Sequence, residues 1–465
     1  MKLLKNISYT FSSNALSILV SIFIVLIIPK FIGVHEYGLW QLFIFYYGYV
    51  GVLHLGWADG LFLRRGGQTV KEINKESISA ETLMFIVFNC LIGFCIELYG
   101  VFFASHDIFI ILSLGFAVLI VNTRTWITMI LQSIGDFKSY AINLSAQSIV
   151  YLLLIISILF FKLADYRFMI VAFLISQMVT SISGFYQLRG VLNYNSKLDF
   201  KDAFSELKLN IGSGFKLMIA NFTAILIIGV IRFGIQQKWS ISTFGKISLV
   251  LSIANFMMVF INAVSLVLFP TLRRTKQIPK VTYEGIRNIL MPLLYLMMFI
   301  YFPIMLIIPQ WLPKYAGALR YASILMPMMV YQGKFEILSN TFMKNFRMEA
   351  KLMTINIITL IISVVLTIVN AYILHNINYV VFSIAFVMGI RSIMSEVVLS
   401  RKIKVKFISE LLFENIFIIG FIFFTWNYSI VISILGYLIV MVLYLLYKQK
   451  KIKDGMVTLK NLSLY

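Results

Sequence analysis

The sequence is poor in charged residues, cysteine and histidine. Charged residues make up 13% of its 465 positions, about half the share found in soluble domains, and its mean hydropathy is +0.91. Its two cysteines, Cys90 and Cys95, lie five residues apart in one apolar run, and there are only four histidines. These shortages exclude an ordinary soluble fold and a zinc site made of Cys and His. We therefore expect neither a bound metal nor a cofactor.

Sequence motifs of catalysis are missing as well. There is no Walker-type loop, dinucleotide-binding glycine motif or nucleophile triad on a segment that could use it. The predicted outward loops are about a dozen residues or shorter, which leaves little room for a catalytic surface. The sequence therefore predicts a protein that is not an enzyme, and any transport would draw on a gradient, the membrane potential or substrate flux.

Long apolar runs are abundant. A run of about 20 apolar residues is long enough to cross the hydrocarbon layer of a bilayer as a helix. Such runs recur along the whole chain and predict an all-α polytopic membrane protein with fourteen transmembrane helices. The predicted spans are 14–33, 38–62, 82–104, 108–132, 141–162, 168–188, 211–237, 244–270, 288–309, 321–343, 352–374, 379–399, 411–427 and 428–447.

The chain also contains a weak internal repeat. A shift of 207 residues places Asn14 on Asn221, and a shift of 209 places Asp136 on Asn345. Two six-helix lobes in parallel pseudo-repeat are therefore expected, related by an axis along the membrane normal, with a transport path in the cleft between them and two helices appended at the C-terminus. The predicted boundaries are 1–188 for the first lobe, 189–210 for a cytoplasmic linker, 211–400 for the second lobe, and 401–465 for the appended helices and a basic tail.

Basic residues predict the orientation. With the N-terminus inside, 28 of the 40 Lys and Arg residues fall in cytoplasmic segments, 7 fall on the outer side and 5 lie within spans. This asymmetry predicts cytoplasmic N- and C-termini. It also accounts for most of the formal charge of +21, so contacts with anionic membrane lipids are expected and nucleic-acid binding is not.

Five basic side chains lie within predicted spans, where a charge costs about 2.5–3.5 kcal/mol and usually faces a partner or an aqueous path. They indicate an anionic cargo. A shift of 209 takes Arg124 to Gly333, beside Lys334, so these two are the leading substrate-binding candidates. Inter-helix pairing is the alternative for both. The five residues are Arg124, Lys216, Arg232, Lys334 and Arg391.

The other embedded cations have more conservative interpretations. Arg232 and Lys216 are additional substrate-binding candidates, although either side chain could instead extend to the nearer membrane interface. Arg391 is interpreted mainly as a structural partner of Glu396.

Two acids are candidates for ion coupling. Glu336 lies two residues from Lys334 and so on a roughly opposite helix face, where it could relay a proton or cation. Pairing with a neighbouring helix is the alternative. Asp59 is the second candidate, with Arg64 as its expected structural partner.

Several short segments resemble one transporter family. They are Pro29–Gly33, Glu36–Trp40, His54–Gly60, Gly135–Lys138 and Leu312–Ala316. They are similar to the bacterial polysaccharide transporters, including O-antigen flippases, of the multidrug/oligosaccharidyl-lipid/polysaccharide exporter superfamily. The resemblance implies two six-helix lobes in a V shape, often extended to fourteen helices.

By the same resemblance, the expected function is translocation of undecaprenyl diphosphate-linked oligosaccharide, such as an O-antigen, capsule or teichuronic-type repeat unit. Movement would run from the inner to the outer leaflet of the bacterial plasma membrane by alternating access, with basic residues in a central cavity holding the diphosphate. Partners would include a glycan polymerase or chain-length machinery. The alternatives are a multidrug cation antiporter, whose cavity should be acidic, and a membrane glycan polymerase or ligase, which the short outer loops disfavour.

Overall fold

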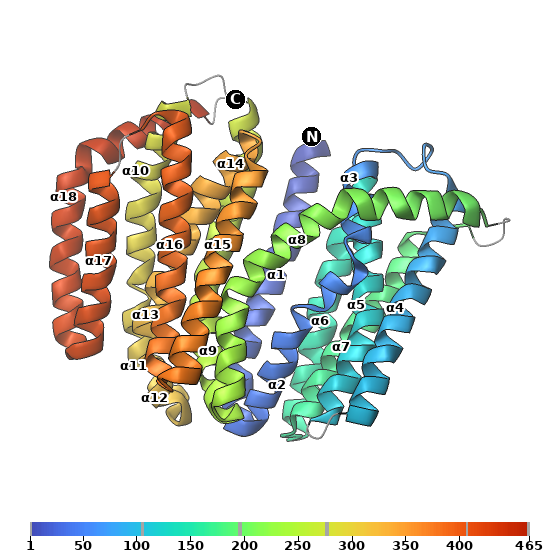
Figure 1. Ribbon diagram of the computed structural model, residues 1–465, viewed down its shortest axis with the longest axis horizontal. Coiled ribbons are helices and arrows are strands. Elements are labelled where there is room, and N and C mark those ends of the chain that lie inside the picture. Colours follow the sequence, from blue (N-terminus) through green and yellow to red (C-terminus); the bar gives the residue numbers. More distant parts are fainter. Residues whose placement is uncertain (1, 104–106, 194–197, 275–278, 406–407, 463–465) are drawn as a thin grey trace. The chain divides into compact units, whose positions relative to one another are not determined.

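A computed structural model describes residues 2–103, 107–193, 198–274, 279–405 and 408–462, without the side chains of 2–8, 259–260, 262–274 and 459–462. Every regular element in these ranges is a helix. The chain divides into two compact units, Met1–Phe222 and Thr223–Tyr465. The predicted all-α fold is therefore confirmed (Figure 1).

Twelve helices in the described ranges are long and apolar enough to cross a membrane. The other two predicted spans, 38–62 and 321–343, are helical but broken. The first consists of α2 (Val34–Tyr47), the 3₁₀ helix η1 (Val50–His54) and α3 (Trp57–Arg65). The second consists of α13 (Ala322–Lys334), the π-helix η3 (Phe335–Asn340) and α14 (Thr341–Asn345).

The remaining helices of unit 1 pack both against their neighbours in sequence and against more distant helices. Here α4 packs on α5, α7 packs on α5 and α6, and α1 returns to pack on α6. Their bounds are α1 (Lys2–Phe31), α4 (Lys75–Phe103), α5 (Ile108–Ser133), α6 (Phe137–Phe160), α7 (Tyr166–Gln187) and α8 (Phe200–Lys238), of which the last continues into unit 2.

An aromatic cluster holds α3 against α4 and α5. The ring centroids of Phe85 and Trp126 are 4.5 Å apart, and those of Trp57 and Phe85 are 5.2 Å apart. Both indole N–H groups have buried acceptors, since Trp57 donates to Glu81 at 2.8 Å and Trp126 donates to Thr82 at 2.9 Å. Large rings with satisfied polar edges make a well-specified core.

Glycines allow α8 to cross α3 at backbone contact. A Cβ atom on Gly60 would overlap the backbone oxygen of Asn210, and one on Gly214 would overlap the backbone oxygen of Gly56. Gly56 has a positive φ of 76°, where a side chain would be strained. Figure 1 shows the first part of α8 crossing the ends of α3 and α4. The break in the span 38–62 thus exposes the backbone against which α8 packs.

Unit 2 is organised around α13, which is buried along almost its whole length. It packs against α9, α10, α16 and α17, while α18 runs along α10. The other bounds are α9 (Ile241–Arg274), α10 (Pro279–Met298), α11 (Tyr301–Trp311), η2 (Pro313–Tyr315), α12 (Ala316–Leu319), α15 (Glu349–Thr367), η4 (Ile368–Ile373), α16 (Ile377–Ile403), α17 (Ile408–Asn427) and α18 (Ile430–Leu462).

The connection between the units is largely helical. We expected a linker over 189–210, but α8 begins at Phe200 and the units divide between Phe222 and Thr223, within that helix. Residues 194–197 of the predicted linker lie outside the described residues. The first part of α8 is held to the rest of unit 1, because Glu206 accepts a hydrogen bond from Arg64 and Asn210 donates one to Glu81.

Candidate functional site

Arg124 lies at the centre of a polar cluster in unit 1. Its Nε donates to Oδ1 of Asn143 on α6 at 3.1 Å, and its Nη1 donates to Oε1 of Gln177 on α7 at 3.0 Å. Asn143 is itself fixed, because its amide nitrogen donates to the backbone oxygen of Thr180 at 2.8 Å. Three neighbouring helices therefore hold one guanidinium, and both of its partners are neutral amides.

The charge of Arg124 is left uncompensated. No ion pair joins it to a carboxylate among the described residues, and its side chain is only partly buried. A guanidinium has five N–H donors, and the two amides occupy two of them. The remaining donors suit a carboxylate or phosphate oxygen, which a guanidinium binds with charge-assisted hydrogen bonds.

Lys334 has a different environment. It is 1% exposed, and its Nζ donates to Glu396 on α16 and to Glu414 on α17 at 2.7 Å in each case. Two carboxylates therefore already balance its charge. Its role in holding a diphosphate stays a prediction.

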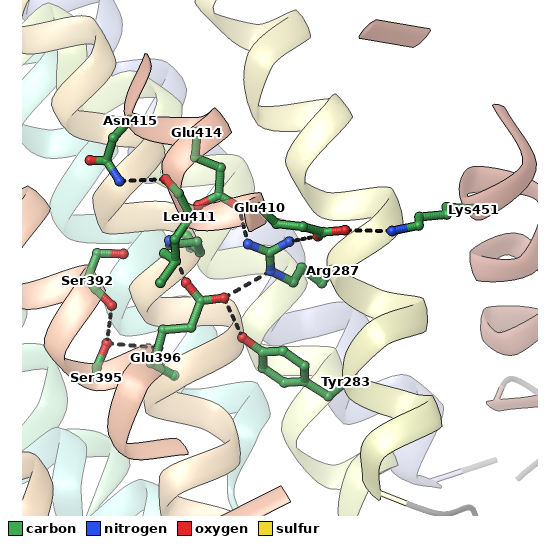
Figure 2. Close-up of polar contacts among 12 residues, drawn as sticks. Tyr283, Arg287, Ser392, Ser395, Glu396, Glu410, Leu411, Glu414, Asn415 and Lys451 are labelled. Carbon is green, nitrogen blue, oxygen red and sulfur yellow. Dashed lines mark hydrogen bonds and ion pairs between the residues drawn. The ribbon is translucent and has the colours of Figure 1, made fainter. Parts of the chain in front are cut away.

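Arg287 on α10 completes this buried ion cluster. Figure 2 shows its guanidinium between Glu396, Glu410 and Glu414, and it pairs with all three. Glu396 also accepts a hydrogen bond of 2.8 Å from the hydroxyl of Tyr283. The ion cluster, here Arg287, Lys334, Glu396, Glu410 and Glu414, links α10, α13, α16 and α17.

A polar opening lies at the edge of the ion cluster. Glu410 accepts hydrogen bonds of 2.7 Å from Lys448 and from Lys451, both on α18. A cavity of about 330 Å³ is lined by Arg287, Glu410, Lys451 and Asp454 among others. Arg287 and Glu410 therefore border this polar cavity, whereas Lys334 lies in the interior of the unit.

The predicted pair of Arg391 and Glu396 is wrong. Arg391 is 3% exposed; its Nε donates to Oδ1 of Asn356 at 3.0 Å and its Nη1 donates to Oε1 of Gln332 at 3.4 Å. The guanidinium also lies 3.7 Å from the ring centroid of Phe335. The two residues lie five positions apart on α16 and point to different neighbours, and Glu396 is occupied by the ion cluster.

Glu336 has two hydrogen-bond partners on its own helix face. It accepts a hydrogen bond of 3.2 Å from Gln332 and one of 2.7 Å from Asn340. Both amides lie four residues away along the helix, a separation that brings side chains together. Glu336 lies within the π-helical segment η3, and such segments often occur at functional sites.

Asp59 also has a different neighbour from the one expected. Arg64 pairs with Glu206 at 2.8 Å instead, and Asp59 lies 3.9 Å from Nε2 of His54. Its expected partner is turned toward the start of α8. The coupling role of Asp59 stays a prediction.

The two remaining basic candidates lie on α8. Lys216 is exposed. Arg232 is partly buried, donates to Ser248 at 3.1 Å and lies 5.4 Å from the ring centroid of Phe244. Arg124 and Lys216 belong to unit 1, whereas Arg232 and Lys334 belong to unit 2.

Sequence reasoning overlooked the two carboxylates on the first appended helix. Glu410 and Glu414 lie four residues apart in a helix with no other charged residue, which places them on one face. That spacing was the available signal. The amides that hold Arg124 had no comparable signal, because a neutral side chain adds no embedded charge to the sequence.

An apolar cavity of about 670 Å³ lies between α13, α16 and α17 in unit 2. Its wall includes Tyr331, Gly389 and Ile390, which neighbour Gln332 and Arg391 in sequence. Its few polar groups include Asn415, which accepts a hydrogen bond of 2.7 Å from Tyr331. An elongated apolar group would fit this lining.

The sequence matches no family model and no curated protein. The fold does match solved transporters. An inward-facing multidrug resistance transporter of the MATE family in the MOP superfamily aligns with a TM-score of 0.57 and 11% identity, over 88% of this chain and 98% of that one. The lipid II flippase MurJ, in an inward closed conformation, aligns with a TM-score of 0.58 and 12% identity, over 96% of this chain and 99% of that one.

A MATE transporter in the straight conformation gives a TM-score of 0.56 at 12% identity, over 87% of this chain and 96% of that one. Identities this low establish a shared architecture only. The chain therefore has the fold of MOP superfamily transporters.

Proposed function

We propose that this protein is a flippase that moves undecaprenyl diphosphate-linked oligosaccharide from the inner to the outer leaflet by alternating access. The observation that carries the proposal is Arg124, a guanidinium within a membrane span whose only hydrogen-bond partners among the described residues are two neutral amides. A charge is costly at that depth, and an anionic ligand would compensate it. A diphosphate offers several acceptor oxygens for the donors that the amides leave free.

The apolar cavity supports an amphipathic cargo. It lies in the same unit as Arg391, and its walls are mostly apolar, with a few polar side chains such as Asn370 and Asn415. A polyprenyl chain is a long hydrocarbon, so a cargo with a charged head and an apolar tail suits the side chains of this protein better than a small hydrophilic solute does.

The superfamily contains both drug transporters and a lipid flippase, so its fold alone leaves the cargo open. MurJ, whose name states that it flips lipid II, aligns with 96% of this chain, against 88% for the inward-facing MATE transporter. A cation antiporter is disfavoured because Arg124 would repel its substrate. A glycan polymerase or ligase is disfavoured by the short predicted outer loops.

The other predicted residues have subordinate roles in this proposal. Arg232 and Lys216 would assist diphosphate binding, and Lys334 would do so only if its pairing with Glu396 and Glu414 opened. Coupling would use Glu336 or Asp59. An inside-negative potential already favours outward movement of an anion, by about 2.3 kcal/mol per charge at 100 mV. Coupling to an ion gradient would supply energy beyond that of the potential.

Such a protein would lie in a bacterial plasma membrane with both termini in the cytoplasm. Anionic lipids would contact its basic loops. A glycan polymerase or chain-length machinery would receive the product at the outer leaflet.

The test is transfer of a fluorescent polyprenyl diphosphate-linked oligosaccharide across vesicles that contain the purified protein. We expect the parent protein to move it and Arg124→Ala to lose most of this activity while remaining folded. Arg189→Ala is the matched control, because Arg189 is an exposed arginine of the same unit and should transport normally.

Failure of the parent protein to move the lipid, together with transport of a small cationic dye, would overturn the proposal in favour of the antiporter. Elongation of the glycan in the same vesicles would favour the polymerase. Normal transport by Arg124→Ala would remove the observation on which the proposal rests.

A further inference from the structure

Arg391 makes the same two hydrogen bonds in unit 2 that Arg124 makes in unit 1. In both cases Nε donates to Oδ1 of an asparagine, at 3.0 Å for Arg391 and 3.1 Å for Arg124. In both cases Nη1 donates to Oε1 of a glutamine, at 3.4 Å and 3.0 Å. The two units therefore contain the same arginine–asparagine–glutamine triad.

The triads occupy matching helices of the predicted repeat, but arginine and glutamine have exchanged places. Each triad uses the fourth, fifth and sixth helices of its lobe. In chain order the first triad is Arg124 on α5, Asn143 on α6 and Gln177 on α7, and the second is Gln332 on α13, Asn356 on α15 and Arg391 on α16.

The sequence distances support this correspondence. Gln332 lies 208 residues after Arg124, between the shifts of 207 and 209 that revealed the repeat. Asn356 lies 213 residues after Asn143 and Arg391 lies 214 residues after Gln177, so these two pairs share nearly the same, slightly longer shift. We expected Lys334 to be the counterpart of Arg124. Lys334 is two residues beyond Gln332, which in a helix turns it about 200° away, toward the ion cluster.

We propose that the second triad is an anion-binding site of unit 2, with Arg391 as the residue that binds a phosphate-type oxyanion. Like Arg124, Arg391 contacts no carboxylate among the described residues, and its Nη2 has no hydrogen-bond partner there. The ring of Phe335 covers one face of the guanidinium, and the two amides fix its plane. Nη2 is therefore the nitrogen whose N–H groups are left to donate charge-assisted hydrogen bonds to a phosphate oxygen.

One feature distinguishes the two triads. Gln332, which accepts from Arg391, donates to Glu336 at 3.2 Å. In unit 2, Gln332 therefore links the guanidinium of Arg391 to the carboxylate of Glu336 through two hydrogen bonds. Among the described residues, neither Asn143 nor Gln177 links Arg124 to an acid in this way. The negative charge of Glu336 competes with an incoming anion, so the second site should bind more weakly than the first.

This inference deepens the proposed function and rests on it for the identity of the natural ligand. The binding test does not. Inorganic diphosphate is titrated into the purified full-length protein, and binding is followed by calorimetry. We expect Arg391→Gln to weaken binding at one of two sites about tenfold, as loss of a charge-assisted contact does.

The exchange of residues between the two triads supplies matched variants. Gln332→Arg combined with Arg391→Gln gives unit 2 the arrangement of unit 1, and should restore binding. Arg124→Gln combined with Gln177→Arg gives unit 1 the arrangement of unit 2. This double variant should recover the diphosphate binding that Arg124→Gln alone loses.

A transport measurement separates binding from a merely structural role. In vesicles, Arg391→Gln should raise the half-saturating concentration of a diphosphate-linked lipid more than that of a monophosphate-linked lipid. A structural role would lower the rate for both lipids alike. Glu336→Gln should tighten diphosphate binding, and it tests the site without disturbing the packing of Arg391.

Unchanged diphosphate binding in both Arg391→Gln and Glu336→Gln would overturn the second site. If Arg391→Gln does not fold, the test rests on Glu336→Gln: tighter diphosphate binding supports the second site, and unchanged binding overturns it. A parent protein that binds diphosphate at two sites but moves no lipid would contradict the proposed function while leaving the second site in place.

Discussion

Lys334 on α13 donates a 2.7 Å hydrogen bond to Glu414 on α17, and both residues are buried. The bond joins the first appended helix to the most buried helix of unit 2. Without Glu410 and Glu414, Arg287 and Lys334 would share Glu396 as their only carboxylate among the described residues. The helix α17 is therefore part of the charge balance of unit 2.

Removal of one member of the ion cluster should be strongly destabilising. Lys334→Met leaves Glu414 and Glu396 facing Arg287 alone, and an uncompensated buried charge costs about 3–5 kcal/mol. We expect a large drop in the melting temperature of the purified protein.

The double variant Lys334→Met with Glu414→Gln leaves Arg287 opposite Glu396 and Glu410, with one fewer excess charge. Much of the lost melting temperature should return. If Lys334→Met has the same melting temperature as the parent protein, the buried pair of Lys334 and Glu414 contributes nothing to stability.

Glu81 should contribute more to stability than Glu206, although both connect the first part of α8 to the rest of unit 1. Glu81 is fully buried and accepts hydrogen bonds from Trp57 at 2.8 Å and from Asn210 at 2.6 Å. Glu81→Ala leaves both donors without an acceptor, at about 1–3 kcal/mol for each buried group. Glu206 is partly exposed, so Glu206→Ala should cost less.

Unfolding in denaturant would rank these variants, with Glu76→Ala, at an exposed acid of the same helix as Glu81, as the control. Equal losses for Glu81→Ala and Glu206→Ala would contradict the expected order.

Gly60→Ala should disrupt the crossing of α3 and α8, because the added methyl group overlaps the backbone of Asn210. Backbone atoms cannot rotate away, so the helices must separate. Gly212→Ala is the matched control, since nothing lies within 4 Å of its Cβ position and alanine favours a helix by about 1 kcal/mol.

Limited proteolysis within 198–214 would report separation of the helices. We expect faster cleavage in Gly60→Ala and unchanged or slower cleavage in Gly212→Ala. Identical cleavage of both variants would mean that the crossing yields more easily than its geometry indicates.

The predicted orientation can be tested on a background without Cys90 and Cys95. Gly317 and Gly190 are both exposed, and neither has an atom within 4 Å of its Cβ position. The distribution of basic residues places Gly317 outside and Gly190 inside. An impermeant thiol reagent should therefore label Gly317→Cys in intact cells but not Gly190→Cys, and the reverse pattern would invert the topology.

The positions of the helices could be predicted from sequence, because a run of about 20 apolar residues leaves few alternatives to a membrane helix. The breaks in two spans could not. In the second span, Leu55 and Gly56 adopt positive φ angles, which suits the contact of Gly56 with α8. That contact is determined by the tertiary structure.

Partners of the embedded charges were the least predictable feature. Arg391 was assigned to Glu396 because the two are close in sequence, yet it bonds to Asn356, 35 residues away. From the sequence alone, an arginine whose partners are neutral amides cannot be distinguished from one that pairs with an acid. The repeat predicted the correct helices, but its shift of 209 takes Arg124 to Gly333, one residue past Gln332, and the basic side chain beside that position is Lys334.

The continuous course of α8 has a consequence for cutting and rejoining this chain. A first fragment ending at residue 188 would lose Glu206 and Asn210, and with them the acceptor of Arg64 and an amide donor to Glu81. The N-terminal lobe thus depends on the beginning of a helix that ends in the C-terminal lobe. If the chain is divided before Phe200 and the halves are expressed separately, the first half lacks the end of its own unit, whereas the second half contains the whole of unit 2. Reassembly would then require the first three turns of α8, carried by the second half, to bind the first half.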